Sequence, residues 1–167
     1  MNSAFLKSIN WQTQKKGQEI LSQKVQSMLF CSGSLTAILK EQGVLTVQVL
    51  HESMQDARDI FDREKALLPE DECFWVREVL LSVNQKNAVF ARSVIPQKIC
   101  NTLEVLTKMG QQPLGEFLFS HHIKRGDFEW SATSNGLARH SLFYIAESAL
   151  LVGECFLNEY WDSYYKA

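Results

Sequence analysis

The chain has 167 residues, of which 46% are hydrophobic and 22% are charged, and its formal net charge is -2. This composition excludes a disordered, collagen-like or coiled-coil protein, and the near-neutral charge excludes the basic field that nucleic-acid binding needs. A chain of this length buries enough surface for one hydrophobic core with a closed pocket. The sequence therefore predicts a single domain over residues 1–167 that does not bind nucleic acid.

Signals for export, membrane insertion and disulfide formation are missing from the sequence. No apolar run approaches the roughly 20 residues that span a bilayer, and residues 1–17 lack the apolar segment of a secretory signal. The four cysteines stand far apart and form no CxxC pair, which is typical of reduced thiols. We therefore predict a cytoplasmic protein without stable membrane insertion, and we expect a monomer.

The first part of the chain is predicted to be helical. Apolar side chains recur at helical spacing over residues 17–30. Ser34 is a typical N-cap for a second short helix over residues 35–42, which Gly43 ends. A DNA-binding helix-turn-helix would need basic residues on its second helix, and only Lys40 is basic there, so we reject that interpretation.

The rest of the chain alternates between strands and short helices. Period-two alternation predicts a strand over residues 44–50 and a hairpin of residues 73–83 and 88–95 around a turn at 84–87. We interpret the charged stretch 52–72 as a solvated loop or short helix, not as a site. Helices are predicted over residues 97–109 and 113–120, and strands over residues 123–131, 141–145 and 150–157. This order predicts an α+β fold, a single antiparallel β-sheet with helices covering it.

Four charged residues stand where the strand pattern calls for hydrophobic ones. Arg77 and Glu78 interrupt the two opposite faces of the first hairpin strand, Arg92 interrupts the second, and Glu154 interrupts the last strand. These charges either lie on a solvent face, form structural ion pairs, or line an apolar cavity that binds an anion. Arginine matches a carboxylate, and burial can raise the pKa of a glutamate that moves a proton. We therefore interpret Arg77, Arg92 and Glu154 as a candidate site.

A metal site is not predicted. The adjacent residues His121 and His122 would point to opposite faces of a strand, and no acidic or cysteine partner stands at ligand spacing. The glycine-containing segment 110–115 lacks the spacing and the lysine of a phosphate-binding loop. Neither motif therefore points to a cofactor.

Four segments together resemble the bacterial chorismate lyase family. They are WVREVLL at residues 75–81, ARSVIP at 91–96, GQQPLGEFLF at 110–119 and LLVGECFL at 150–157. They occur in the order and spacing of that family, and residues 34–36 resemble a family segment at the edge of the pocket. The similarity covers residues 30–157 and follows a variable helical N-terminus over residues 1–30.

This resemblance implies a fold in which helices cap an internal ligand pocket. It also implies a cofactor-independent, metal-free lyase that converts chorismate to 4-hydroxybenzoate and pyruvate, the first step of ubiquinone biosynthesis. The resemblance assigns the ring carboxylate to Arg77 and the backbone N–H of Leu114, and the ring hydroxyl to Glu154. It implies a further contact from the segment around Leu35. We expect Arg92 to hold the enolpyruvyl carboxylate or to tune Glu154.

The main alternative is a non-catalytic module of the same fold that binds a small aromatic acid. Effector domains of some bacterial transcription regulators are of this kind, and they carry a separate basic DNA-binding domain. Only about 30 residues precede the region of resemblance here, and they are not strongly basic. We therefore favour the enzyme, with Arg77 and Glu154 as its catalytic residues.

Overall fold

The structure, a computed structural model, describes residues 1–166, with side chains through residue 164; Ala167, the end of the predicted domain, lies outside the described residues. This part of the chain forms one eight-stranded sheet in the order β1-β6-β7-β8-β4-β3-β2, with β5 paired to β7, and every pairing is antiparallel. The strands are β1 (Gln12–Thr13), β2 (Leu45–Asp56), β3 (Cys73–Val83), β4 (Lys86–Pro96), β5 (Lys124–Arg125), β6 (Glu129–Ala132), β7 (Gly136–Ile145) and β8 (Ser148–Leu157). The predicted α+β fold with one antiparallel sheet is confirmed.

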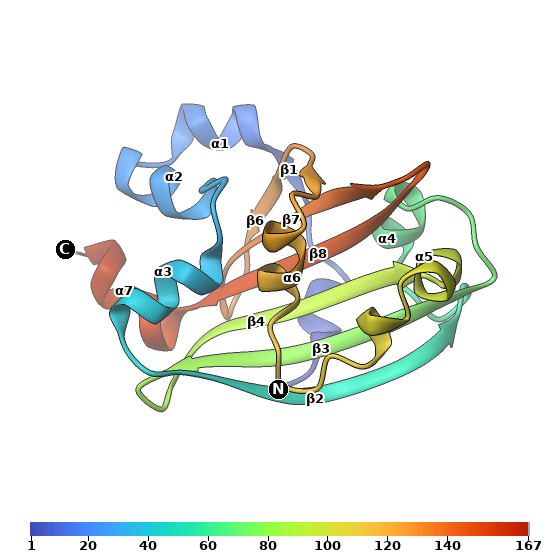
Figure 1. The fold of residues 1–167 in the computed structure, drawn as a ribbon. Helices are drawn as coiled ribbons and strands as arrows, with labels where there is room; N and C mark the ends of the chain where they lie inside the picture. The colour runs from blue at the N-terminus through green and yellow to red at the C-terminus, as the bar shows by residue number, and fades with distance from the viewer. Residues whose placement is uncertain (167) are drawn as a thin grey trace.

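Helices cover both faces of this sheet. They are η1 (Ser3–Leu6), α1 (Gln14–Ile20), α2 (Gln23–Leu29), α3 (Leu35–Gln42), α4 (Asp62–Leu67), α5 (Gln97–Thr102), η2 (Glu104–Thr107), α6 (Leu114–Ser120) and α7 (Asn158–Lys166). Figure 1 shows α3, α5 and α6 over the face turned toward the viewer, which we call the front face. Apolar side chains of η1 and of the segments flanking α4 pack on the opposite, back face. Within residues 1–166, no helix combines the length and apolar composition needed to cross a membrane.

Two local predictions are confirmed where capping and turn chemistry decide the structure. Ser34 caps α3 by accepting a hydrogen bond from the backbone N–H of Ala37, 3.2 Å away. The β3–β4 hairpin turns at Asn84 and Gln85, whose φ angles are +48° and +68°. Two consecutive positive φ angles are typical of the tight turn whose twist matches a hairpin.

Several element boundaries differ from the predictions. The strand predicted over residues 123–131 is split into β5 and β6, and the one predicted over residues 141–145 begins at Gly136. The helix predicted over residues 17–30 is split, because Ser22 leaves the helical conformation and caps α2. The helix predicted over residues 97–109 ends at Thr102 and continues as η2. The first long strand extends into the charged stretch as far as Asp56, and α4 follows within it. The interpretation of that stretch as solvated is wrong for Glu64, which is buried beneath the back face of the sheet.

Strand register decides which charges share a face. Arg77 pairs with Ser93, whereas Glu78 pairs with Arg92. Glu154 pairs with Ala91 on one side and with Arg139 on the other. Because side chains alternate between faces, Arg77, Glu154 and Arg139 project to the front and Glu78 and Arg92 to the back.

Candidate active site

A small closed cavity of about 40 Å³ lies between the front face of the sheet and helices α3 and α6. Its polar lining consists of Thr36, Arg77, Ser93, Arg125 and Glu154, and apolar side chains form most of the remaining wall. A mostly apolar wall with a few converging polar groups is typical of a small-molecule site. Arg77 and Glu154, which the sequence singles out, both line this cavity.

Three larger hollows, of about 590, 750 and 460 Å³, are open grooves on the surface. His140 and Glu129 line the first, and their side chains pair at 2.6 Å. This contact and an ion pair with Arg63 lower the pKa of Glu129 to about 2, against the opposing effect of burial. Glu129 thus has its partners within the protein, and we assign the candidate site to the closed cavity, where Arg77 and Glu154 lie.

Arg77 connects the sheet to the cover of the cavity. Its guanidinium is fully buried and forms an ion pair with Glu52 on the neighbouring strand β2. The Nη2 atom donates hydrogen bonds to the carbonyl oxygens of Gly110, at 2.7 Å, and Gln112, at 3.0 Å. These three bonds engage three of the five N–H groups of the guanidinium, so donors remain for a ligand carboxylate.

Glu154 lies between two arginines. Its Oε2 atom is 2.6 Å from Nε of Arg139 and 3.5 Å from Nη2 of Arg125. Burial by itself would raise the pKa of Glu154, but the charges of the two arginines and the hydrogen bond from Arg139 outweigh burial and lower it. The expectation that burial raises this pKa is therefore wrong. Glu154 is an ionised acceptor in this structure.

Arg125 and Arg139 are missing from the set that strand alternation selects. Arg125 occupies a two-residue strand, too short for a pattern, and Arg139 is followed by polar residues that hide its alternation. The pairing of Arg139 with Glu154 in the β7–β8 register is the signal that identifies it. Arg139 also donates from Nη1 to the carbonyl oxygens of Leu29, at 2.8 Å, and Cys31, at 3.3 Å. Arg139 therefore holds Glu154 and the end of α2 in one arrangement.

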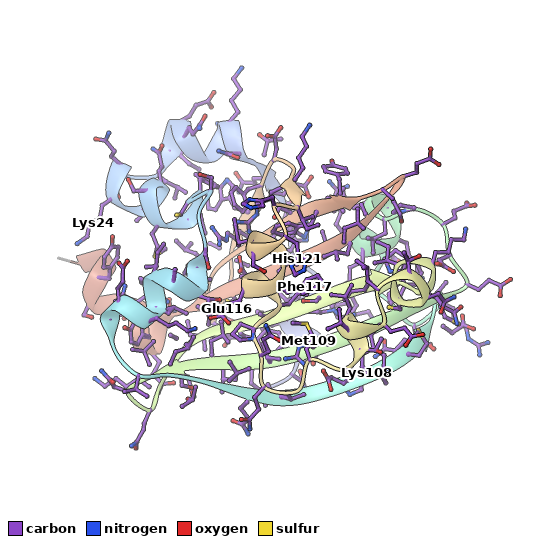
Figure 2. The ribbon with its side chains drawn as sticks, viewed as in Figure 1. Lys24, Lys108, Met109, Glu116, Phe117 and His121 are labelled. Carbon is purple, nitrogen blue, oxygen red and sulfur yellow. The ribbon has the colours of Figure 1, made fainter. Side chains whose placement is uncertain are left out.

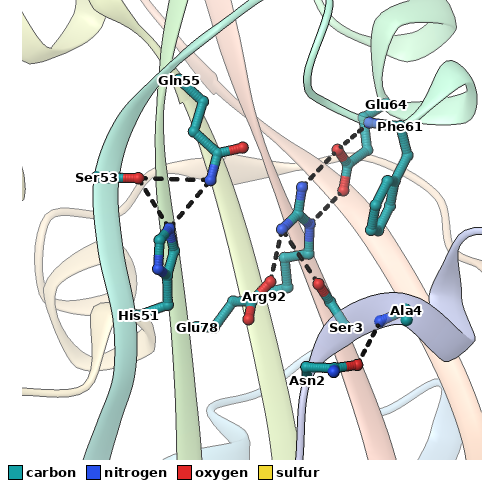
Figure 3. A network of polar contacts seen from close by, with 10 residues as sticks. All are labelled: Asn2, Ser3, Ala4, His51, Ser53, Gln55, Phe61, Glu64, Glu78 and Arg92. Carbon is teal, nitrogen blue, oxygen red and sulfur yellow. Dashed lines mark hydrogen bonds and ion pairs between the residues drawn. The ribbon is translucent and has the colours of Figure 1, made fainter.

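Arg92 does not reach the cavity. On the back face, its Nε and Nη2 atoms donate to Glu64 at 2.7 and 3.0 Å, and its Nη1 donates to Glu78 at 2.6 Å (Figure 3). Its guanidinium also lies 4.2 Å from the ring centroid of Phe61. Two carboxylates thus occupy the donors of Arg92 inside the protein. The expectation that Arg92 joins the site fails because the register aligns it with Glu78, away from Arg77.

Leu35 and Leu114 line the cavity from the two covering helices, each at the first residue of its helix. The N–H groups of a first helical turn have no partner within the helix, so the backbone of Leu114 has a donor suited to a carboxylate. An ion pair between Lys40 and Glu116 joins α3 to α6. Met109 and Phe117, labelled in Figure 2, pack beneath this cover in the front apolar core.

Residues suited to a metal ion are not gathered at this site. Within residues 1–166, no three His, Cys, Asp or Glu side chains form a group that could hold one. The charged groups that line the cavity are two arginines and one glutamate. Their chemistry suits an anionic organic ligand with a hydroxyl group.

Comparison with known proteins identifies the family of this chain. A sequence profile described as chorismate lyase matches residues 5–166. The chain belongs to the chorismate lyase family. A chorismate pyruvate-lyase from Pectobacterium carotovorum is 31% identical over 160 residues, which cover 94% of this chain and 89% of that protein. A probable chorismate pyruvate-lyase from Halorhodospira halophila is 34% identical over 155 residues, with 81% and 82% covered.

Solved structures give a weaker likeness to this member of the chorismate lyase family. The ligand-binding domain of a putative GntR-family transcriptional regulator from Bordetella bronchiseptica aligns with a TM-score of 0.49 and 16% identity. The alignment covers 70% of this chain and 85% of that domain. A possible transcriptional regulator, YydK, from Bacillus subtilis also has a TM-score of 0.49, with 12% identity over 69% of this chain and 59% of that one.

The back-face cluster is expected to stabilise the fold only as a complete set. Replacing Arg92→Met leaves the carboxylates of Glu64 and Glu78 buried without their partner, so the free energy of unfolding should fall by about 3–5 kcal/mol. The triple variant Arg92→Met, Glu64→Gln, Glu78→Gln should recover most of that loss. Urea denaturation measures the free energy of unfolding of both variants. Equal stability of the single variant and the parent would contradict a stabilising role of the cluster.

Glu154 is expected to contribute a pH-dependent part of the stability. Its pKa in the folded chain lies below the ordinary value of 4.5, so its contribution is present above that pH and is lost as the pH falls through the lowered value. The stability gap between the parent and Glu154→Gln should therefore be widest near neutral pH and narrow in acid. Denaturation at a series of pH values tests this. Glu159→Gln on the exposed side of α7 is the matched control for the loss of a carboxylate outside the site.

Proposed function

We propose that this chain is a chorismate lyase, a carbon–oxygen lyase that converts chorismate to 4-hydroxybenzoate and pyruvate, the step that leads toward ubiquinone. The observation that carries the proposal is the closed cavity, which gathers Arg77, Leu114 and Glu154 in a chain of this family. Arg77 and the N–H of Leu114 bind the ring carboxylate, and Glu154 accepts a hydrogen bond from the ring hydroxyl. The segment at Leu35 adds a contact from the cover. The monomeric state and the cytoplasmic location stay predictions.

The reaction removes the enolpyruvyl group and makes the ring aromatic. The ether bond at ring C3 breaks, and its electron pair leaves with the enolpyruvyl oxygen. The C4–H electron pair forms the new ring double bond, and the released proton ends on the methylene carbon, which becomes the methyl group of pyruvate. Aromaticity supplies much of the driving force, so the protein mainly positions the substrate and excludes water.

The ionised state of Glu154 suits this role. A carboxylate that stays charged accepts the hydrogen bond of the ring hydroxyl and fixes C4 and its hydrogen in one orientation. Arg139 holds the carboxylate in place from the neighbouring strand. The low-dielectric wall of the cavity strengthens each of these contacts.

Turnover by the purified protein tests the proposal. We expect 4-hydroxybenzoate and pyruvate to form from chorismate in equal amounts without added metal, measured by chromatography and a coupled assay. Glu154→Ala should lower kcat by at least about 100-fold, since it removes the positioned acceptor. Arg77→Ala should weaken 4-hydroxybenzoate binding by about 10- to 100-fold, the loss of a charged hydrogen bond.

Two outcomes would count against this assignment. If both variants are folded by circular dichroism and turn over chorismate like the parent, the site residues are wrong. If the parent binds 4-hydroxybenzoate but leaves chorismate unchanged, the chain is a binding module instead of an enzyme.

A further inference from the structure

Two buried arginine nitrogens at the candidate site have no hydrogen-bond partner within residues 1–166. They are Nη1 of Arg125 and Nη2 of Arg139, and both arginines contact the carboxylate of Glu154. The side chain of Arg125 is 10% exposed and that of Arg139 is 1% exposed. A buried charged donor without an acceptor is costly, so such donors point to a ligand that supplies the acceptor.

The charge balance around the cavity indicates that this ligand is an anion. Among the side chains that line the cavity or pair with its lining, three arginines (Arg77, Arg125 and Arg139) face two carboxylates (Glu52 and Glu154). Burial and the charge of Arg139 lower the pKa of Arg125 to about 10, against the opposing effect of Glu154. The surroundings of the cavity therefore carry an excess positive charge that a bound anion would compensate.

Arg125 is held rigidly with its unpaired donor available. Its Nε atom donates to Ser141 Oγ at 2.7 Å, and its guanidinium lies 4.2 Å from the ring centroid of Phe128 and 4.9 Å from that of Phe143. Arg125 lines the cavity together with Arg77 and Glu154. A fixed guanidinium loses little conformational entropy on binding, which favours directional recognition of a carboxylate.

We propose that Arg125 binds the enolpyruvyl carboxylate of chorismate, the group that leaves as pyruvate. This inference rests on the proposed function, in which Arg77 holds the carboxylate at ring C1 and Glu154 meets the hydroxyl at C4. The enolpyruvyl ether is on C3, next to C4, so the enolpyruvyl carboxylate of the bound substrate lies on the same side of the ring as Glu154. Arg125 is the cavity arginine beside Glu154, with its Nη2 3.5 Å from that carboxylate. Arg139 does not line the cavity and positions Glu154 from the neighbouring strand β7.

This assignment replaces the role expected for Arg92. Arg92 lies on the back face, where Glu64 and Glu78 already occupy its donors. Arg125 in contrast keeps a buried donor free of protein partners among the described residues. As the C3–O bond breaks, negative charge grows on the departing enolpyruvyl group, and a neighbouring guanidinium stabilises that charge.

The test compares ligands with one and two carboxylates. For Arg125→Met, we expect kcat/KM for chorismate to fall by about 10- to 100-fold, while the dissociation constant of 4-hydroxybenzoate stays within about threefold of the parent. Arg125→Lys, which keeps the charge, should recover part of the loss. Arg77→Met should weaken the binding of both ligands. Lys124→Met, at the exposed neighbouring position of β5, is the matched control and should behave like the parent.

Each other outcome has a distinct meaning. The inference would be overturned if Arg125→Met weakened the binding of chorismate and of 4-hydroxybenzoate equally. It would also be overturned if that variant kept the parental kcat/KM for chorismate. If Arg125→Met does not fold, Arg125→Gln is compared in the same way, and parental kcat/KM for chorismate in that variant, or an equal loss of affinity for chorismate and 4-hydroxybenzoate, would overturn the inference. Failure of the parent itself to convert chorismate would overturn the proposed function, and this inference with it.

Discussion

The ion pair between Glu154 and Arg139 is the contact on which the arrangement of the site depends. Both residues project from adjacent central strands, and their pairing is fixed by the β7–β8 register. Arg139 also reaches the carbonyl oxygens at the end of α2, so the same guanidinium orients the carboxylate and ties down the chain that leads to α3. A slip of one residue in that register would turn one of the two side chains to the other face of the sheet relative to its partner, which would break the ion pair and release the end of α2 from the site.

The sheet buries charged side chains on both faces, and the two sets differ in whether their hydrogen-bond donors all have acceptors within the protein. On the back face, Arg92 is surrounded by two carboxylates and needs nothing further. On the front face, the arginines outnumber the carboxylates, and two of their nitrogens lack acceptors within residues 1–166. Buried charge alone therefore does not mark a functional site. The front face differs from the back face by the donors of Arg125 and Arg139, which have no acceptor among the described residues.

The sequence allowed much of this to be predicted, and its limits have physical causes. Local chemistry placed α3 and the β3–β4 hairpin correctly, since capping and turn residues act over a few positions. Alternation identified four charges that are all largely buried. It could not assign them to a shared face, because cross-strand register is a long-range property, and so Arg92 was misplaced. Arg125 and Glu64 were missed because a two-residue strand and a short charged helix carry no alternation to interrupt.

The hydrogen bonds from Arg77 to Gly110 and Gln112 have a mechanical consequence. The cavity of about 40 Å³ is far smaller than the roughly 300 Å³ or more of ordinary ligand pockets, so a substrate enters only when the cover opens. The guanidinium at the base of the cavity is also the tether of the loop before α6. A carboxylate that arrives at Arg77 binds the donors that this tether leaves open. The same guanidinium therefore contacts the bound carboxylate and holds the loop before α6, so the occupancy of the cavity and the position of its cover are coupled through one side chain.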